Sequence, residues 1–392
     1  MVRGRVVDRI TAIDEAAWDA CASSAADGGN PFVRHRFLRC VEESGCVGGR
    51  SGWTPQHVLI EDEHGLLAAA PAYRKDHSYG EYVFDHGWAE AYENAGGRYY
   101  PKLLVAAPFT PVPGPRLLVR PGADRDAARA ALLAALTEET ARRGWSSLHV
   151  NFCTEEESTW LGARGLLQRT GEQFHWTNRG YESFDGFLAD LASRKRKAVR
   201  KEREQAMAGG AITIETLRGT AIRTSHWDAF FTFYMDTGGR KWGRPYLNRK
   251  FFQLLGERMA DEVVLVMAFR AGQPIAGALN LLGPNCLYGR YWGCTEYHRS
   301  LHFEVCYYRA IEYAIAHNLQ RVEAGAQGPH KLARGYLPTR TYSAHWIADP
   351  MFRRAVDNYL ASERAHVEKE IEDLSDHSPF RNTENDTDDE GT

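Results

Sequence analysis

The run that decides the fold is Val263-Val-Leu-Val-Met-Ala-Phe-Arg-Ala-Gly-Gln-Pro-Ile-Ala-Gly-Ala-Leu-Asn-Leu281. Two apolar stretches of strand length separated by a short turn that contains glycine predict an antiparallel hairpin. The pattern before it predicts a helix over 248–259. The pattern after it predicts a helix over 302–317 that leads into a strand at 321–325. This half of the chain is therefore expected to form one α/β unit.

The first half of the chain shows the same order of elements. We expect two helices, at 31–44 and 127–143, and three strands, at 57–61, 66–73 and 147–152. The economical interpretation is two copies of one unit. The predicted fold class is α/β (α+β), with two domains that each hold a mixed, twisted sheet flanked by helices.

The expected domain boundaries follow from the segments that lie between the two α/β units and after the second one. Residues 1–168 are expected to form the first domain and 169–348 the second, followed by a helix over 349–374. Residues 375–392 are too polar and acidic to fold alone. The net charge of −3 is the sum of −8 from Glu368 onward and +5 before it, so the folded part is mildly basic.

The composition indicates the expected location of the protein and argues against cysteine-based sites. The 392 residues are 43% hydrophobic and 25% charged, no apolar run is long enough to span a bilayer, and no signal peptide is visible, so a cytoplasmic location is expected. The seven cysteines form no Cys-x-x-Cys pair, which argues against a disulfide framework and against a cysteine zinc site. No metal or cofactor is expected.

A glycine-rich run follows the strand at 321–325: Glu323-Ala-Gly-Ala-Gln-Gly-Pro-His-Lys-Leu-Ala-Arg-Gly-Tyr336. A strand that ends in such a turn presents backbone N–H groups and a lysine at one sheet edge, which suits an anionic group or a developing oxyanion. Lys331 is therefore the first catalytic candidate, with Arg334 and Tyr336 as substrate-binding candidates. The alternative is an ordinary loop with solvated charges.

Two carboxylates are candidates for the proton transfer. Asp85 ends an aromatic strand, where partial burial would raise its pKa toward that of a useful base, and Glu323 lies on the strand that feeds the Lys331 loop. The alternative for Asp85 is a helix cap, and the alternative for Glu323 is an ion pair with a neighbouring arginine.

Basic and aromatic side chains supply the remaining binding candidates. The segment from Ser193 to Arg203 holds seven bases and one acid, so Lys197 and Arg200 are candidates for contact with a polyanion, although a solvated helix face has the same pattern. Among the aromatic residues, Tyr82, Tyr291 and Trp292 are candidates for stacking on a base or a sugar.

The order of elements in each unit resembles the GNAT acyltransferase fold, and the tandem arrangement resembles the Fem-type family. The chain is more closely similar to the bacterial group of Fem-like N-acyltransferases described as peptidoglycan biosynthesis or recognition proteins. The runs that carry this resemblance are 78–85, 97–102, 108–116 and 325–336. The sequence departs from Fem enzymes in having no long helical-hairpin insertion, and His330 and Tyr336 differ from the Fem pattern.

The resemblance implies transfer of an aminoacyl group from aminoacyl-tRNA to an amine of a cell-wall precursor or small molecule, with no DNA partner and no membrane span. An alternative is an N-acyltransferase that uses acyl-CoA or an acyl carrier. The stretch Arg290–His302 argues against CoA because it lacks the second glycine of a pyrophosphate loop. A further alternative is a noncatalytic protein that binds peptidoglycan precursors.

Overall fold

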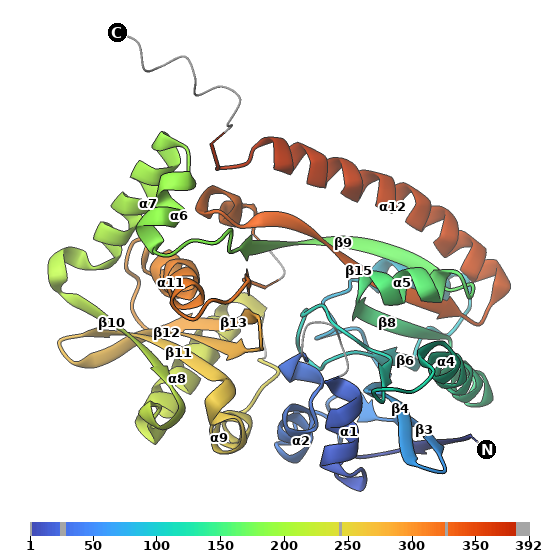
Figure 1. Ribbon diagram of the computed structural model, residues 1–392. Helices are drawn as coiled ribbons and strands as arrows, with labels where there is room; N and C mark the ends of the chain where they lie inside the picture. Colours follow the sequence, from blue (N-terminus) through green and yellow to red (C-terminus); the bar gives the residue numbers. More distant parts are fainter. Residues whose placement is uncertain (1, 24–28, 243–244, 326–327, 382–392) are drawn as a thin grey trace. The chain divides into compact units, whose positions relative to one another are not determined.

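The computed structural model describes residues 2–23, 29–242, 245–325 and 328–381 (Figure 1). By their internal contacts the residues form two compact units. The first unit consists of Met1–Gly171, Tyr246–Met259 and Arg340–Glu368, and the second of Glu172–Pro245, Ala260–Thr339 and Lys369–Thr392.

The first unit contains two groups of paired strands. An antiparallel sheet has the order β1 (Arg3–Val7), β3 (His57–Asp62), β4 (Gly65–Ala70) and β7 (Leu118–Val119). The other group has the order β15 (Leu337–Ile347), β8 (Ser147–Cys153), β6 (Lys102–Val105), β5 (Ala72–Lys75) and β2 (Trp53–Pro55). Strands β6 and β8 are parallel, whereas β15 pairs with β8, β6 with β5, and β5 with β2 in antiparallel fashion.

The helices of the first unit cover these strands. They are α1 (Glu15–Ala22), α2 (His35–Glu43), α3 (His86–Asn94), α4 (Arg125–Arg142), α5 (Glu155–Gly162), α9 (Arg249–Arg258) and most of α12 (Pro350–Asp376). The local sequence explains where several helices begin, because Asp14, Asp124 and Thr154 each accept a hydrogen bond from the first turn of the helix that follows. Helix α4 buries Leu132 and Leu136 against a core that includes Ile60 and Val150.

The structure differs from the expected domain boundaries in two segments that the sequence assigned to the second domain, Tyr246–Met259 and residues 340–348. Helix α9 contacts α2 of the first unit: Phe251 packs edge-to-face on Phe37, and Arg258 pairs with Glu43. Residues 340–348, expected in the second domain, also belong to the first unit because β15 pairs with β8.

The second unit contains the predicted hairpin. Its strand order is β10 (Ile212–Arg218), β11 (Val263–Arg270), β12 (Gln273–Leu282), β13 (Cys286–Cys294), β14 (Arg321–Glu323) and β9 (Leu167–Thr177), and only β13 and β14 are parallel neighbours. Its longer helices are α6 (Phe184–Asp190), α7 (Ser193–Ala206), α8 (Thr224–Trp242) and α11 (Arg309–Ala316). A short helix α10 (Leu301–Phe303) and a π-helical segment (Glu304–Tyr308) precede α11, and a 3-10 helix covers Pro329–Arg334.

Among the described helices, none is both long enough and apolar enough to cross a membrane. Of the expected tail, 375–392, the structure describes only 375–381. Helix α12 continues to Asp376, and Phe380 packs in the core of the second unit beside Phe187. Residues 382–392 lie outside the described part of the chain.

Candidate active site

The register of three neighbouring strands in the second unit builds a polar row. Tyr288 of β13 lies opposite Glu323 of β14, and Glu323 lies opposite His175 of β9. Because residues opposite one another in a sheet point to the same face, these three side chains share one face. All three are buried. The alternate face carries Leu287, Val322 and Trp176, which belong to the hydrophobic core around α11.

Strands β13 and β14 separate directly after this row. They pair at three positions, from Cys286 with Arg321 to Tyr288 with Glu323, and then β14 ends while β13 continues to Cys294. On its other side β13 has a bulge: Leu279 of β12 pairs with Tyr291 and Asn280 pairs with Gly289. Arg290 is therefore the extra residue, and a bulge redirects a side chain out of the regular alternation.

Glu323 is 2% exposed, and its Oε1 lies 3.0 Å from Nε of Arg321. Burial raises the pKa of the Glu323 carboxyl to about 7, against the opposing effects of Arg321 and Arg290. The predicted ion pair with a neighbouring arginine is thus present. A carboxyl that titrates near neutrality is also suited to accepting a proton, so the catalytic role of Glu323 stays a prediction.

Lys331 lies in the 3-10 helix that follows β14 and is 2% exposed. Its Nζ donates a hydrogen bond of 2.9 Å to the carbonyl oxygen of Gly325. Burial lowers the pKa of the Lys331 ammonium to about 8, and Arg290 lowers it further while Cys306 opposes the shift. The alternative of a solvated loop charge is therefore wrong for Lys331.

Arg334 and Tyr336, which the sequence predicts to bind substrate, have internal partners. Arg334 forms a bidentate pair with Glu202 of α7, at 3.0 and 2.6 Å, and its guanidinium lies 3.4 Å from the ring centre of Phe303. Tyr336 is fully buried and donates to the carbonyl oxygen of Tyr307 at 3.2 Å. Tyr336 is therefore a core residue, which corrects the expectation that it contacts substrate.

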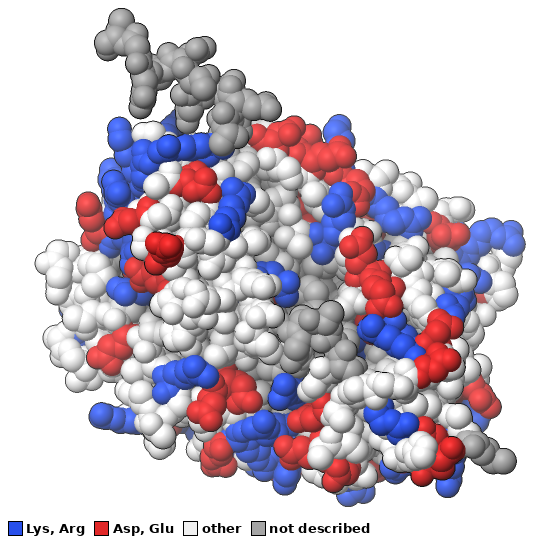
Figure 2. Space-filling view, in the orientation of Figure 1, with Lys and Arg blue, Asp and Glu red and all other residues white. Residues whose placement is uncertain are grey.

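The basic helix α7 borders a cavity of about 300 Å³. The residues that line it are Arg194, Lys195, Ala198, Val199, Glu202, Ala333 and Arg334. Lys197 and Arg200 are exposed and are not among them. Figure 2 shows Lys and Arg side chains gathered over the region where Figure 1 places α7. Both predicted residues thus remain candidates for contact with a polyanion at this surface.

The aromatic candidates lie in both units. Tyr291 and Trp292 are half-buried on the part of β13 beyond the end of β14. Tyr291 packs edge-to-face on Tyr234, and Trp292 on His302. Tyr82 lies in the loop that connects β5 to α3 in the first unit. It is half-buried and has a positive φ of 59°. Their contact with substrate stays a prediction.

Asp85 belongs to a buried charge cluster in the first unit. It is 1% exposed and hydrogen-bonds to Nζ of the fully buried Lys102, which also donates to Ser78 Oγ and Glu81 Oε2 at 2.9 Å each. Burial alone would raise the pKa of Asp85, but Lys102 and His149 reverse the shift and hold it well below its usual range. The expected raised pKa is therefore wrong, and Asp85 is not suited to act as a base at neutral pH. It occupies the cap position of α3, yet its side chain makes no capping hydrogen bond.

Sequence reasoning missed several members of these clusters. In the second unit it missed His175, whose pKa burial lowers to about 3, with Arg321 and Lys331 acting in the same direction. In the first unit it missed Lys102 and the buried pair of His149 and His345, whose Nδ1 atoms are 2.7 Å apart. The available signal was a charged or imidazole residue within an apolar strand, as in Lys102-Leu-Leu-Val105.

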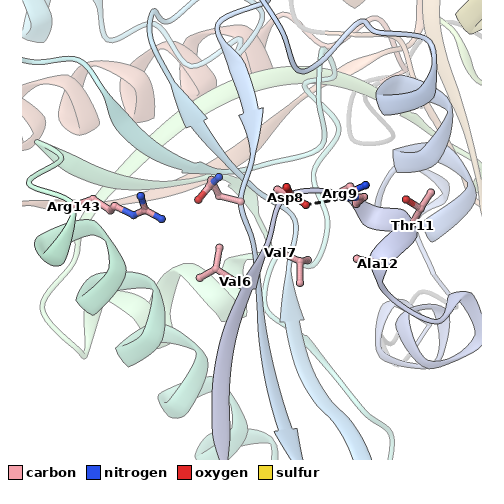
Figure 3. A pocket seen from close by; sticks show the side chains of 8 residues that line it. Val6, Val7, Asp8, Arg9, Thr11, Ala12 and Arg143 are labelled. Atoms are coloured by element: carbon pink, nitrogen blue, oxygen red, sulfur yellow. Dashed lines mark hydrogen bonds and ion pairs between the residues drawn. The ribbon is translucent and has the colours of Figure 1, made fainter.

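A larger cavity, of about 660 Å³, lies in the first unit and contains none of the predicted site residues (Figure 3). It is lined by Val6, Val7, Asp8, Arg9, Thr11, Ala12, Gln56 and Arg143. Its charged groups are exposed, and Asp8 and Arg9 pair with each other at 3.1 Å. This cavity therefore offers a weaker setting for catalysis than the buried polar row of the second unit.

Comparison with solved structures identifies the fold. FemX is 10% identical, with a TM-score of 0.55 and coverage of 88% of this chain and 98% of that chain. L-PGS from Bacillus licheniformis is 10% identical, with a TM-score of 0.52 and coverage of 88% and 97%. The C-terminal domain of a putative lysylphosphatidylglycerol synthetase from Agrobacterium fabrum is 8% identical, with a TM-score of 0.51 and coverage of 88% and 95%. The predicted tandem GNAT-like α/β fold is confirmed.

The family follows from the sequence match. The FemAB-like family model, described as peptidoglycan biosynthesis/recognition, matches residues 9–382. The chain therefore belongs to the FemAB-like family, and the resemblance stated from its motifs is confirmed. A comparison with curated proteins found no match.

Proposed function

We propose that the protein is an N-acyltransferase that moves an aminoacyl group from aminoacyl-tRNA to an amine of a cell-wall precursor or small molecule. One observation carries the proposal: Glu323 and Lys331, both buried and both titrating near neutrality, flank the point where β13 and β14 separate. A base and a cation in this setting fit the needs of amide formation from an activated ester.

The reaction needs little else from the protein. The neutral acceptor amine attacks the ester carbonyl, the new C–N bond forms, and Lys331 stabilises the oxyanion of the tetrahedral intermediate. Glu323 takes the proton that the amine loses, and the C–O bond to the ribose oxygen then breaks. That oxygen leaves with a proton returned from Glu323, so the enzyme ends in its starting state.

The corresponding position in the first unit is filled by the chain itself, which supports placing the catalytic site in the second unit. Its parallel strands β6 and β8 also separate, because β6 ends at Val105 while β8 continues to Cys153. There the chain itself binds to β8: Gly114 N donates to Phe152 O at 3.0 Å, and Arg116 Nε donates to Asn151 O at 2.9 Å. Arg116 is fully buried. The position that corresponds to the candidate site is thus occupied by the segment around Arg116.

The donor is tested by giving the purified protein tRNA charged with labelled amino acids, together with an amine-rich metabolite extract, and labelled acetyl-CoA in a parallel reaction. Transfer that ribonuclease abolishes is the expected result. Label that moves only from CoA would replace the donor in our proposal. Label that moves from neither donor would favour a noncatalytic binding protein.

The same assay tests the surface of α7. Reversing the charges of the exposed residues Lys197 and Arg200 with glutamate should raise the KM for charged tRNA and flatten its salt dependence, because phosphate contacts release counterions. The matched control is Arg270→Glu, since Arg270 is half-exposed at the end of β11 in the same unit and pairs with Glu296. An unchanged KM in the double variant would show that this helix face is only solvated.

The pH dependence of transfer should be bell-shaped. The rate rises as Glu323 loses its proton around its pKa of about 7, and falls as Lys331 loses its charge around its pKa of about 8. Measurement of kcat/KM from about pH 5.5 to about pH 9.5 covers both limbs. Glu323→Gln should lower the rate and remove the acidic limb. An acidic limb that persists in Glu323→Gln would assign the proton transfer to another group.

A further inference from the structure

The exposed face of α7 carries a row of bases. Arg194, Lys197 and Lys201 are exposed, and because they follow one another at intervals of three and four residues they lie on one stripe of the helix. We call these three residues the basic stripe. Val199 and Ala206 are buried on the opposite side of the helix. Within the described part of the chain, the ion pairs of α7 are made by other residues of the helix, so the basic stripe presents positive charge to solvent without a carboxylate partner.

The start of α7 also favours an anion. Ala192 holds the cap position and provides no side-chain hydrogen bond, and the first turn of the helix contains no acid. The N–H groups of the first turn and the helix dipole both stabilise negative charge at this end of a helix. The basic stripe thus begins where the dipole of α7 is positive.

The last residues that the structure describes are fixed beside the start of α7. Ala192, directly before the helix, donates from its N–H to the carbonyl oxygen of Pro379 at 2.9 Å. The N–H of Arg381 donates to the carbonyl oxygen of Asp190 at 3.1 Å. Phe380, between them, packs in the core of the second unit. The chain beyond Arg381 therefore starts beside a residue that lies three positions before α7.

The sequence beyond this point is acidic. Residues 382–392, which we call the acidic segment, contain five acids and no base. Glu390 is nine residues beyond Arg381, and nine residues of extended chain span about 30 Å. The distance from Asp190 to Lys201 is at most about 23 Å, because three residues of chain and eight residues of helix separate them. The acids of the segment are thus within reach of the whole basic stripe.

The spacing of the charges is also compatible. Acids stand at every second position from Glu384 to Glu390, and residues two apart in an extended chain are about 6–7 Å apart. The bases of the stripe follow one another along the helix axis at about 4.5–6 Å. Successive acids can therefore meet successive bases.

We propose that the acidic segment binds the basic stripe of its own chain and competes with polyanions for this surface. Exposed ion pairs are individually weak, but the tether raises the local concentration of the segment to about the millimolar range. A polyanion of higher charge density then displaces the segment and gains the surface. The inference goes beyond the proposed function, since this contact requires neither a donor nor an acceptor substrate.

Carbodiimide crosslinking tests the contact, because the reagent joins a carboxylate to a lysine amine where the two meet. The full-length protein is treated at low salt, digested and analysed by mass spectrometry. Crosslinks from the acidic segment should concentrate on Lys197 and Lys201, and they should decline strongly at about 1 M salt, where the Debye length is about 3 Å. Lys369 is the control, because it is exposed on α12, lies nearer to the segment along the chain, and stands between Glu368 and Glu370.

Three results would contradict the contact. Crosslinks that form equally at Lys369 and at the lysines of α7, or that persist at high salt, would show that the segment meets lysines at random. The absence of crosslinks to α7 would show that the segment does not bind there. Crosslinked dimers would assign the basic stripe to the acidic segment of a second copy of the chain.

Competition provides a second measurement. A full-length variant with all five acids replaced by amides keeps the length of the segment and removes its charge: Glu384→Gln, Asp386→Asn, Asp388→Asn, Asp389→Asn and Glu390→Gln. A labelled single-stranded RNA is titrated into the wild type and the variant, and binding is followed by fluorescence anisotropy. If the segment covers the stripe for about nine-tenths of the time, the variant should bind the RNA about tenfold more tightly.

A double-mutant cycle separates binding of the segment from general charge repulsion. Lys197→Gln with Lys201→Gln removes most of the basic stripe, so neutralising the acidic segment in that background should change the RNA affinity little. Repulsion that acts without contact would give the same gain in both backgrounds. Thermal unfolding of each variant verifies that it is folded. An equal gain in both backgrounds, or no gain with the intact stripe, would overturn the proposal.

Discussion

Replacing Lys331 with alanine should abolish aminoacyl transfer and leave the fold intact. Removal of a single donor to a developing oxyanion typically costs about 100- to 1,000-fold in kcat. Lys331 is held just beyond the end of β14, where its Nζ donates a hydrogen bond to the carbonyl oxygen of Gly325. Single-turnover transfer with saturating donor measures this loss, because it reports the chemical step rather than product release.

The stability of this variant should change little for an electrostatic reason. Burial and the charge of Arg290 lower the pKa of Lys331, so its ammonium is held in an unfavourable environment and its removal relieves like-charge repulsion. Lys331→Met keeps the length of the side chain and should be equally inactive. Lys250→Ala, at an exposed position on α9, is the control that should retain activity. Near-wild-type turnover in a folded Lys331→Ala would remove Lys331 from the mechanism.

The sequence predicts the local elements of this fold well where apolar periodicity is strong. The hairpin of β11 and β12, the helices α4 and α7 and the strand β8 all lie close to their expected ranges. The expected single strand at 66–73 is divided instead, because Pro71 separates β4 from β5 and the two strands join different strand groups. The assignment of α9 to the first unit depends on the contact between Phe37 and Phe251, which no local sequence pattern predicts.

The candidate site was predictable only where it lies within one run of sequence. Glu323 and Lys331 are eight residues apart, so a strand followed by a turn brings them together. His175 joins them through the antiparallel register of β9 and β14, which is not visible as a sequence pattern. Asp85 was correctly expected to be buried, but its pKa depends on Lys102, seventeen residues later, so the direction of the shift was wrong.

The largest effect on stability should come from Lys102→Met in the first unit. Lys102 is fully buried and donates to Ser78, Glu81 and Asp85. Its removal leaves the buried Asp85 without its cation and leaves Glu81 with the buried Lys75, whose Nζ is 3.8 Å away. Breaking a buried ion pair on one side typically costs about 3–5 kcal/mol. Chemical denaturation at neutral pH should therefore show a loss of this size. Lys250→Met, at an exposed position on α9, is the matched control and should have little effect.

The pH dependence of this loss tests its cause. In the wild type the folded-state pKa of Asp85 is lowered, so Asp85 contributes stability above its unfolded pKa and that contribution fades as the pH falls. Without Lys102, burial dominates and raises the pKa of Asp85, as it already raises the pKa of Glu81 to about 7. Both carboxyl groups then protonate at mildly acidic pH, so the difference between variant and wild type should shrink as the pH is lowered.

Neutralising Glu81 and Asp85 in the Lys102→Met variant should restore part of the lost stability. The triple variant Lys102→Met, Glu81→Gln, Asp85→Asn removes three ionic groups of the cluster together, and replacing buried ionic groups is often nearly neutral. It leaves the buried Lys75, which can lose its proton because burial lowers its pKa to about 7. Its unfolding free energy should exceed that of Lys102→Met and depend less on pH. If the triple variant is no more stable than Lys102→Met, and the deficit of Lys102→Met is the same at every pH, the loss arises from packing of the lysine side chain rather than from its charge.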